Sequence, residues 1–347
     1  MKHRSRPTFR DLARAAGVSP STVSRVANQK ASVDPAIRQR VSKAAVKLGL
    51  DLSRNRPKVI ALLLSNREVL HPYHSHVLSG AEAHCASREH SVLYLTFRYD
   101  GTTSWQRLSI PAVLEQRDLV SGFILAGTNW PNLLELLTRK QVPFSVLGDN
   151  VLSDWNPEAY DVVWSDDIHG AWEVTRYLQL LGHRDIWFAG NRRLSWFARR
   201  YRGYEKAMRE AGAPVRLAEF ESENPKDIGY LAMKSIFSRG EPVSAVFAAD
   251  DLVAEGVYQA LRDRRIRVPE DISVAGFNDI EAGVMHPPLT SVRQFPEQVG
   301  RHLAELLLER VQQPDRPPQQ VTIPTQLVKR ESCARLRKDS HAVRNVS

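Results

Sequence analysis

Short hydrogen-bonding side chains gather near the start of the chain, and their chemistry is that of nucleic-acid recognition. Positions 21 to 28 carry Ser21, Thr22, Ser24, Arg25 and Asn28. Hydroxyl, amide and guanidinium groups of this kind read base edges in the major groove of DNA and bind its phosphate oxygens. The sequence therefore predicts a DNA-binding surface at this point.

Two short helices joined by a tight turn are expected to position these side chains. Thr8 and Asp11 form a candidate capping box at the start of the first helix, and Gly17 ends it. Ser19 is a good N-cap for the second helix, in which Pro20 takes the first position. Because the apolar residues of the second helix occupy one edge only, its polar residues are predicted to face outward.

A third helix is predicted from Asp34, its N-cap, to Leu48, with Gly49 after its end. Three short helices with a polar second helix indicate a helix-turn-helix unit. The alternative is a three-helix part of an enzyme core whose serines and threonines are merely solvated. That alternative does not explain why the cap, the turn and the groove-facing residues occur together.

Charge is unevenly distributed along the chain. Residues 1–58 carry 14 Lys and Arg against 3 Asp and Glu, residues 329–347 carry 6 against 2, and the remainder carries 28 against 34. A basic head on a slightly acidic body indicates one part that binds phosphates and another with a different role.

Cysteine usage and hydropathy favour a cytoplasmic protein. Cys85 and Cys333 are far apart and lack partners at metal-ligand spacing, as expected in a reducing compartment. The basic N-terminus is not followed by an apolar segment typical of a signal peptide. No run approaches the roughly 18 apolar residues of a membrane span, so no membrane partner is expected.

From Val59 onward, short apolar runs alternate with amphipathic segments, which is typical of βαβ units. The predicted strands are Val59–Leu64, Val92–Phe97, Gly122–Ala126, Phe144–Leu147, Val162–Trp164, Ile186–Ala189, Ala245–Ala248, Ile272–Phe277 and Val321–Ile323. The predicted helices are Ser75–His90, Ile110–Arg117, Pro131–Lys140, Gly170–Leu181, Arg200–Ala211, Gly229–Ser238, Leu252–Arg264 and Pro296–Val311. So many strands predict two sheets rather than one, with a ligand site between the two lobes at the carboxyl ends of the strands.

Over nearly its whole length the chain resembles the lactose-repressor/galactose-repressor (LacI/GalR) family. The blocks that carry the resemblance are Asp11–Ser19, Ser21–Val26, Asp166–Gly170, Leu181–Ile186, Arg200–Tyr204, Ala249–Ala254, Ile266–Asp279, Pro287–Val292 and Pro324–Ser332. Each block is modest alone, but their order and spacing are specific.

The resemblance implies an α/β protein with an N-terminal helix-turn-helix headpiece and a two-lobed, type I periplasmic-binding-protein-like body with parallel sheets. The implied parts are the DNA-binding domain 1–49, the linker 50–58, the body 59–340 and a tail 341–347. Lobe 1 would comprise about 59–162 and 292–323, and lobe 2 about 163–291 and 324–340. The linker departs from the family pattern, since no residue matches the leucine with which the family's hinge helix wedges the minor groove.

DNA contacts follow from the resemblance residue by residue. Pro20, Ser21 and Arg25 match the family positions that touch base edges. Thr22, Ser24 and Asn28 match positions that touch phosphates, and Thr8 and Arg38 complete the predicted set of DNA contacts. A headpiece of this size reads only a few base pairs, so we expect a homodimer on a near-palindromic, double-stranded operator. The tail has no leucine heptad, which favours a dimer over a tetramer.

Polar residues at strand-to-helix junctions are predicted to face the cleft between the lobes. They are Tyr73, Asn129, Asp166, Arg200, Asp250 and Asn278. Carboxylates and amides bind hydroxyl groups, and a guanidinium binds an anion or a ring oxygen, so the cleft suits a small polar metabolite, with a sugar or sugar derivative expected. By resemblance Arg200, three residues before Gly203, matches an effector-binding arginine. The alternatives are a surface salt bridge for Arg200 and a helix cap for Asp250.

Other cleft positions differ from the family. Asn224 stands where the family has a stacking aromatic, and Trp196 could supply an apolar face instead, or could simply pack between the lobes. Asp250 stands where the family often has Asn, and Asn278 where it usually has Asp. These changes reverse hydrogen-donor capacity, so no relative's ligand can be assigned to this chain.

The sequence gives little support for an enzyme or for a metal-binding site. It has no Walker-type phosphate loop, no G-x-S-x-G elbow and no zinc-protease helix, so neither catalytic residues nor a cofactor is predicted. His71, His74 and His76 form a histidine-rich run without nearby cysteine or an acidic cluster, and no metal site is predicted there. The sequence predicts a ligand-responsive transcriptional regulator, with repression the expected direction. The alternative is a cytoplasmic small-molecule sensor whose headpiece does not regulate specific operators.

Overall fold

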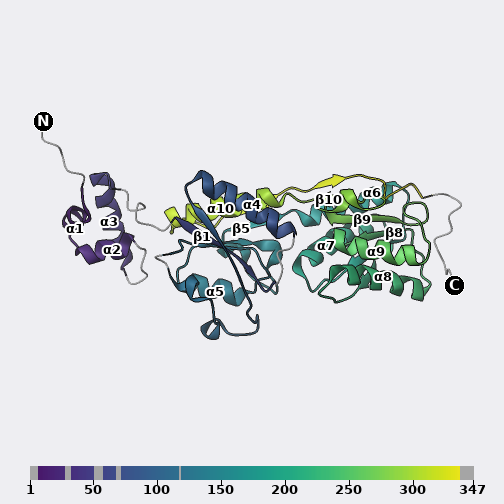
Figure 1. Ribbon diagram of the computed structural model, residues 1–347, viewed down its shortest axis with the longest axis horizontal. Helices are drawn as coiled ribbons and strands as arrows, with labels where there is room; N and C mark the ends of the chain where they lie inside the picture. The colour runs from purple at the N-terminus through teal and green to yellow at the C-terminus, as the bar shows by residue number, and fades with distance from the viewer. Residues whose placement is uncertain (1–6, 28–32, 51–57, 68–71, 117–118, 337–347) are drawn as a thin grey trace.

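The computed structural model of this 347-residue chain describes residues 7–27, 33–50, 58–67, 72–116 and 119–336. Three parts follow one another along the long axis of the molecule: a small helical headpiece, then lobe 1, then lobe 2 (Figure 1). The predicted DNA contact Asn28, most of the linker 50–58, His71 and the tail 341–347 lie outside the described residues.

The headpiece consists of α1 (Phe9–Ala16), α2 (Pro20–Ala27) and α3 (Pro35–Leu48). The predicted capping box is confirmed: the Thr8 amide donates to the Asp11 carboxylate at 2.9 Å, and the Asp11 amide donates to the Thr8 hydroxyl at 3.4 Å. Gly17 and Gly49 end α1 and α3 in the left-handed conformation that glycine adopts without steric cost. The small core includes Leu12, Val23 and Val41, one from each helix.

Lobe 1 is an all-parallel sheet with the strand order β11-β5-β4-β3-β1-β2. Its strands are β1 (Val59–Ser65), β2 (Ser91–Phe97), β3 (Phe123–Leu125), β4 (Phe144–Leu147), β5 (Val162–Ser165) and β11 (Gln320–Ile323). Helices α4 (Pro72–Ser87) and α10 (Pro296–Gln312) cover one face and α5 (Pro131–Arg139) covers the other. Both faces of the sheet are therefore buried, which explains why its strands read as continuous apolar runs.

Lobe 2 has the strand order β12-β10-β9-β8-β6-β7, in which only β12 is antiparallel to its neighbour. Its strands are β6 (Ile186–Gly190), β7 (Arg216–Glu219), β8 (Ala245–Ala248), β9 (Ser273–Asn278), β10 (Thr290–Arg293) and β12 (Gln326–Val328), and its helices are α6 (Asp167–Leu180), α7 (Ser195–Glu210), α8 (Pro225–Arg239) and α9 (Asp251–Asp263). Helices α8 and α9 cross closely at Gly229, where an added Cβ would lie 1.9 Å from the Val253 carbonyl oxygen.

The two lobes are connected by three crossings of the chain. These follow β5, follow β10, and lie between β11 and β12. The first two crossings differ from the predicted boundaries, because residues 163–165 pair within the sheet of lobe 1 and residues 292–293 pair within that of lobe 2.

One predicted helix is wrong and three strands were not predicted. In place of the helix Ile110–Arg117 there is a 3-10 turn, Ala112–Glu115, which follows Pro111. Proline disfavours helical backbone in the residue before it, and so Ile110 cannot begin a helix there. Strands β7, β10 and β12 contain polar or charged residues that mask the apolar pattern. In β10, for example, Thr290 and Ser291 are buried.

No helix among the described residues combines the length and the apolar character needed to span a lipid bilayer.

A buried carboxyl group at the start of α9 makes the stability of lobe 2 depend on pH. Asp251 accepts hydrogen bonds from the Ser291 hydroxyl at 2.7 Å and the Ile280 amide at 3.0 Å. Burial raises its pKa from the ordinary 3.8 to about 7. The folded protein then holds this proton more tightly than the unfolded chain does. The contribution of Asp251 to the free energy of unfolding is therefore full below about pH 4 and is lost as pH rises through 7.

We therefore expect Asp251→Asn, which keeps an oxygen acceptor without a charge, to unfold at higher urea than the wild type at pH 8, by a margin that is clearly smaller at pH 5. Urea titrations followed by circular dichroism at both pH values measure this. A variant destabilised to the same extent at both would show that Asp251 is ionised in the fold.

Candidate functional site

Helix α2 carries five of the residues predicted to contact DNA. Pro20, Ser21, Ser24 and Arg25 are exposed and Thr22 is partly buried. On the opposite face, Val23 and Val26 are buried against α1 and α3. This arrangement follows from the helical period, since apolar residues three apart lie on one face and leave the other to solvent. The face presents hydroxyl and guanidinium donors in one short stretch, as a base-reading surface requires.

Ser19 organises the first turn of α2. Its hydroxyl accepts the Thr22 amide at 3.1 Å and lies 2.7 Å from the Ser21 hydroxyl and 2.8 Å from the Thr22 hydroxyl. These three hydroxyls form a small network at the start of the helix, a place where phosphate oxygens bind well. Thr8 plays a comparable part in α1, where its hydroxyl donates to Asp11 at 2.7 Å.

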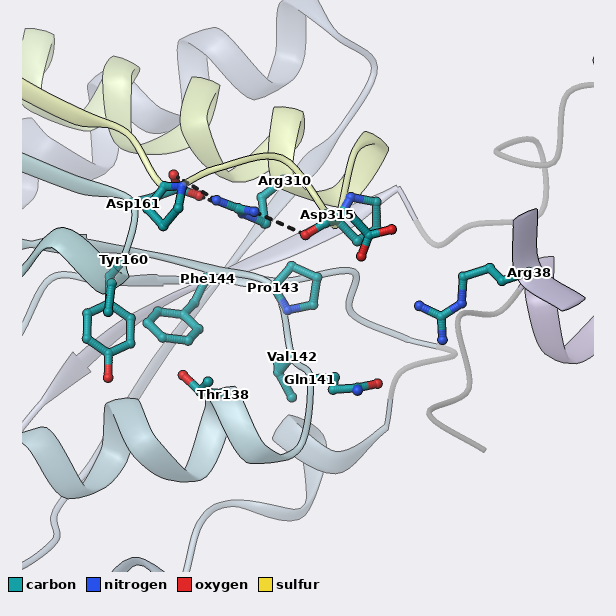
Figure 2. Close-up of a pocket in the computed structure, with 13 residues that line it drawn as sticks. Arg38, Thr138, Gln141, Val142, Pro143, Phe144, Tyr160, Asp161, Arg310 and Asp315 are labelled. Carbon is teal, nitrogen blue, oxygen red and sulfur yellow. Dashed lines mark hydrogen bonds and ion pairs between the residues drawn. The ribbon is translucent and has the colours of Figure 1, made fainter. Parts of the chain in front are cut away.

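Arg38 lies on the side of the headpiece that faces lobe 1. It projects from α3 toward a cavity of about 270 Å³ at the base of that lobe, whose wall includes Gln141 and Asp315 (Figure 2). Its Nε is buried without a hydrogen-bond partner in the described structure. In this arrangement the Arg38 side chain is directed at the body rather than along the exposed face of α2.

Between the lobes lies a second, smaller cavity of about 70 Å³, at the carboxyl ends of the strands in both sheets. Its walls combine aromatic, charged and amide side chains. The lining residues are Arg67, Tyr73, His74, Asp149, Asn150, Trp196, Phe197, Arg200, Pro225, Asp250, Asn278 and Gln294. Most of these residues are polar or charged, and three aromatic rings accompany them, a combination that suits a small polar ligand.

Arg200 is the best-connected side chain of this cleft. Its Nε donates to Asp167 at 2.9 Å, its Nη1 to the Ala249 carbonyl at 2.7 Å, and its Nη2 to Asn278 at 2.9 Å and Gln294 at 3.4 Å. It is only 3% exposed, and its guanidinium lies over the ring of Phe277, another residue of lobe 2. The alternative of a surface salt bridge is therefore wrong, because the partner Asp167 is fully buried.

An ion pair connects the two lobes directly. Asp149 follows β4 of lobe 1, and its carboxylate lies 2.8 Å from Nε of Arg199 on α7 of lobe 2. The Asp149 carbonyl also accepts the hydroxyl of Ser195, again across the cleft. Burial and the nearby Asp167 carboxylate raise the pKa of Asp149, although Arg199 opposes them. Separation of the lobes would break both contacts.

Trp196 of lobe 2 contacts a residue of lobe 1 that was not among the predicted site residues. The Arg67 guanidinium lies 4.7 Å from the centre of the Trp196 ring, a cation–π distance. Trp196 therefore packs between the lobes and also lines the cavity. Asp250 likewise combines two roles, since it lines the cavity and also caps α9 by accepting the Val253 amide at 2.8 Å.

Three predicted residues do not line the cavity. Asn129 is fully buried, accepts the Ser65 hydroxyl at 2.5 Å and donates to the Gly127 carbonyl. Asp166 caps α6, and Asn224 is an exposed cap of α8. Polar residues at a strand end serve as helix caps as readily as they serve as ligand contacts.

Several residues that line the cavity were not predicted, although some of them also lie just after the end of a strand. Arg67 is the second residue after β1, and Asp149 and Asn150 are the second and third after β4. Gln294 follows β10, a strand that was not predicted. His74 and Phe197 lie on helices, and only the fold brings them to the cavity. Within the described ranges, no cluster of three histidine, cysteine or acidic side chains could hold a metal ion.

Known regulators share the domains and the fold of this chain. Residues 8–50 match the family described as bacterial regulatory proteins, lacI family, and residues 175–333 match the periplasmic binding protein-like domain. The HTH-type transcriptional repressor PurR of Haemophilus influenzae is 30% identical over 344 residues, which cover 94% of this chain and 98% of the relative.

Two further proteins are similar over the same extent. The Ribose operon repressor of Escherichia coli K12 is 30% identical, with 94% of this chain and 99% of the relative covered. A solved complex of the transcriptional regulator CelR with cellobiose matches with a TM-score of 0.70 and 31% identity, covering 94% of this chain and 100% of that one. This chain therefore belongs to the lacI family of bacterial regulatory proteins.

Proposed function

We propose that this protein is a cytoplasmic transcriptional repressor that reads its operator through α2 and responds to a small polar metabolite bound between the lobes. The observation that carries the proposal is the exposed face of α2, where Ser21, Ser24 and Arg25 stand beside the capped turn at Ser19. Repression is supported by the similarity to PurR and to the Ribose operon repressor, both of which are repressors.

A carbohydrate effector is supported by the Ribose operon repressor and by the cellobiose complex among the similar proteins. The cleft has the chemistry for such a ligand, since Asp250 and Asn278 offer oxygen acceptors and Trp196 and Tyr73 offer aromatic surface. An enzyme function has no comparable support, because the similar proteins reported above are regulators.

Control of DNA binding would pass through the orientation of the lobes. A ligand between them would change the separation that the Asp149–Arg199 ion pair and the Ser195 contact now maintain. In a homodimer, such a change would alter the spacing of the two headpieces relative to their half-sites. Coupling of this kind is typically worth about 1 to 3 kcal/mol.

Selection of bound DNA from a random duplex pool by the full-length protein tests the proposal. We expect enrichment of a near-palindromic consensus, because two copies of α2 related by a two-fold axis read two half-sites. A headpiece variant, Ser21→Ala with Ser24→Ala, is the control and should change or weaken the consensus. The selection is repeated with candidate metabolites, since a corepressor can be required.

The second candidate is a small-molecule sensor whose headpiece does not recognise specific operators. It is supported by the position of Arg38, which faces lobe 1 in this structure. A protein that binds a metabolite saturably but enriches no DNA sequence, with or without that metabolite, would favour this second function.

A further inference from the structure

Three arginines line or border the cleft, and they differ in how their charges are neutralised. Arg199 forms an ion pair with Asp149 at 2.8 Å, and Arg200 forms one with Asp167 at 2.9 Å. Arg67 has no carboxylate within 4.0 Å among the residues that the structure describes. Among the residues that the structure describes, Arg199 and Arg200 therefore have a counter-ion and Arg67 has none.

The Arg67 side chain is anchored so that its guanidinium faces the cavity. It follows β1 of lobe 1, and its Nε donates to the Thr128 hydroxyl at 3.2 Å. The guanidinium carbon lies over the ring of Trp196 in lobe 2, 4.7 Å from the ring centre. Both partners are uncharged, so they orient the guanidinium without neutralising it.

Partial burial makes an unpaired guanidinium costly. Desolvation lowers the pKa of Arg67, and Asp250 offsets that effect only in part. Asp250 is a poor counter-ion, because burial raises its own pKa and one of its oxygens already accepts the Val253 amide. Within the described part of the chain, the cavity therefore has a positive group without a close counter-ion.

We propose that the effector carries an anionic group, a carboxylate or a phosphate, that binds Arg67, while its hydroxyl groups contact Asp250 and Asn278. The effector class is then a sugar acid or a sugar phosphate rather than a neutral sugar. This inference rests on the proposed function, since it names the ligand of the same cleft. A guanidinium fork binds carboxylate and phosphate oxygens through two parallel hydrogen bonds, which gives the contact both strength and direction.

The position of the cavity adds a condition. The cavity of about 70 Å³ lies beside two contacts between the lobes, that of Arg67 with Trp196 and that of Asp149 with Arg199. A ligand that enters between the lobes has to displace or accommodate both contacts.

Calorimetric titration of the full-length protein with matched sugars tests the proposal. The probes are glucose, glucuronate and glucose 6-phosphate, galactose and galacturonate, and ribose and ribose 5-phosphate. The variant is Arg67→Gln, with Arg67→Lys to retain the charge. The matched control is Arg139→Gln, which removes an arginine that stacks on Trp105 at 4.5 Å outside the cleft.

We expect at least one acid to bind about tenfold or more tightly than its neutral partner, the factor typical of a charge-assisted hydrogen bond. Arg67→Gln should reduce that preference to less than about threefold, Arg67→Lys should keep part of it, and Arg139→Gln should leave it unchanged. Uronates and phosphates as separate probes identify which anion is bound.

A neutral sugar that binds as tightly as its acid overturns the proposal, and so does an acid preference that survives Arg67→Gln. Absence of saturable binding by every acid in the panel also overturns it. Operator binding measured on the same samples separates this proposal from the proposed function. If operator binding responds to a neutral sugar, the protein is a regulator but its effector is not an anion. If the protein shows no preference for a specific operator, the proposed regulatory function itself is rejected.

Discussion

Replacement of Arg25 by alanine is expected to weaken specific operator binding by about tenfold to a hundredfold per half-site, while binding to random DNA falls by much less. The reason is that an arginine bound to a base edge is worth roughly 1 to 3 kcal/mol of discrimination. Arg25 is exposed in the last turn of α2, on the face opposite the buried Val23 and Val26. Its removal should therefore leave the headpiece core unchanged.

The measurement is competition binding on the selected operator and on a scrambled duplex, at two salt concentrations, because phosphate contacts depend strongly on salt. The matched control is Arg40→Ala, which removes the same charge from an exposed position of α3. That control should reduce affinity for both DNAs to a similar, smaller extent. Equal losses on both duplexes for Arg25→Ala would show that Arg25 only contacts phosphates.

Replacement of Arg200 by alanine is expected to destabilise the body by about 3 to 5 kcal/mol, the usual effect of leaving one partner of a buried ion pair without its counter-charge. Asp167 is fully buried and would keep only its hydrogen bond from Gln294. The Ala249 carbonyl and the Asn278 side chain would each lose a donor. The response to effector should be lost as well, because Arg200 holds Asn278 in the cavity wall.

Urea unfolding of the full-length protein measures this effect. Arg192→Ala is the control, since Arg192 forms a partly exposed pair with Glu219 for which only about 1 kcal/mol is expected. If Arg200→Ala unfolds at the wild-type midpoint but no longer binds effector, the structural role is contradicted. Arg200 would then act mainly by contacting the ligand.

The site was only partly predictable from the sequence, for a reason that particular residues make clear. Tyr73, Arg200 and Asp250 line the cavity as expected, because parallel strands and their following helices bring these junctions to one edge. Asp166 and Asn224 stand at equivalent junctions but cap helices instead. Whether a capping side chain also reaches the cavity, as that of Asp250 does, depends on its exact direction, and a sequence pattern does not specify that direction.

The sequence by itself determined the order of the parts. Caps at Thr8, Ser19 and Asp34, together with the helical period, specify the headpiece, and apolar runs between amphipathic segments specify two α/β lobes. These signals are local, because capping and burial periodicity act within a few residues.

Only the tertiary structure decided the charge balance of the cleft. Arg67 and Trp196 are 129 positions apart in the sequence and Asp149 and Arg199 are 50 apart, yet each pair meets across the lobes. The pairing of Arg200 with Asp167 likewise depends on how α6 and α7 pack. Electrostatic pairing acts over a few ångströms in space, so the arginine left for a ligand becomes apparent only when all three cations and their partners are placed together.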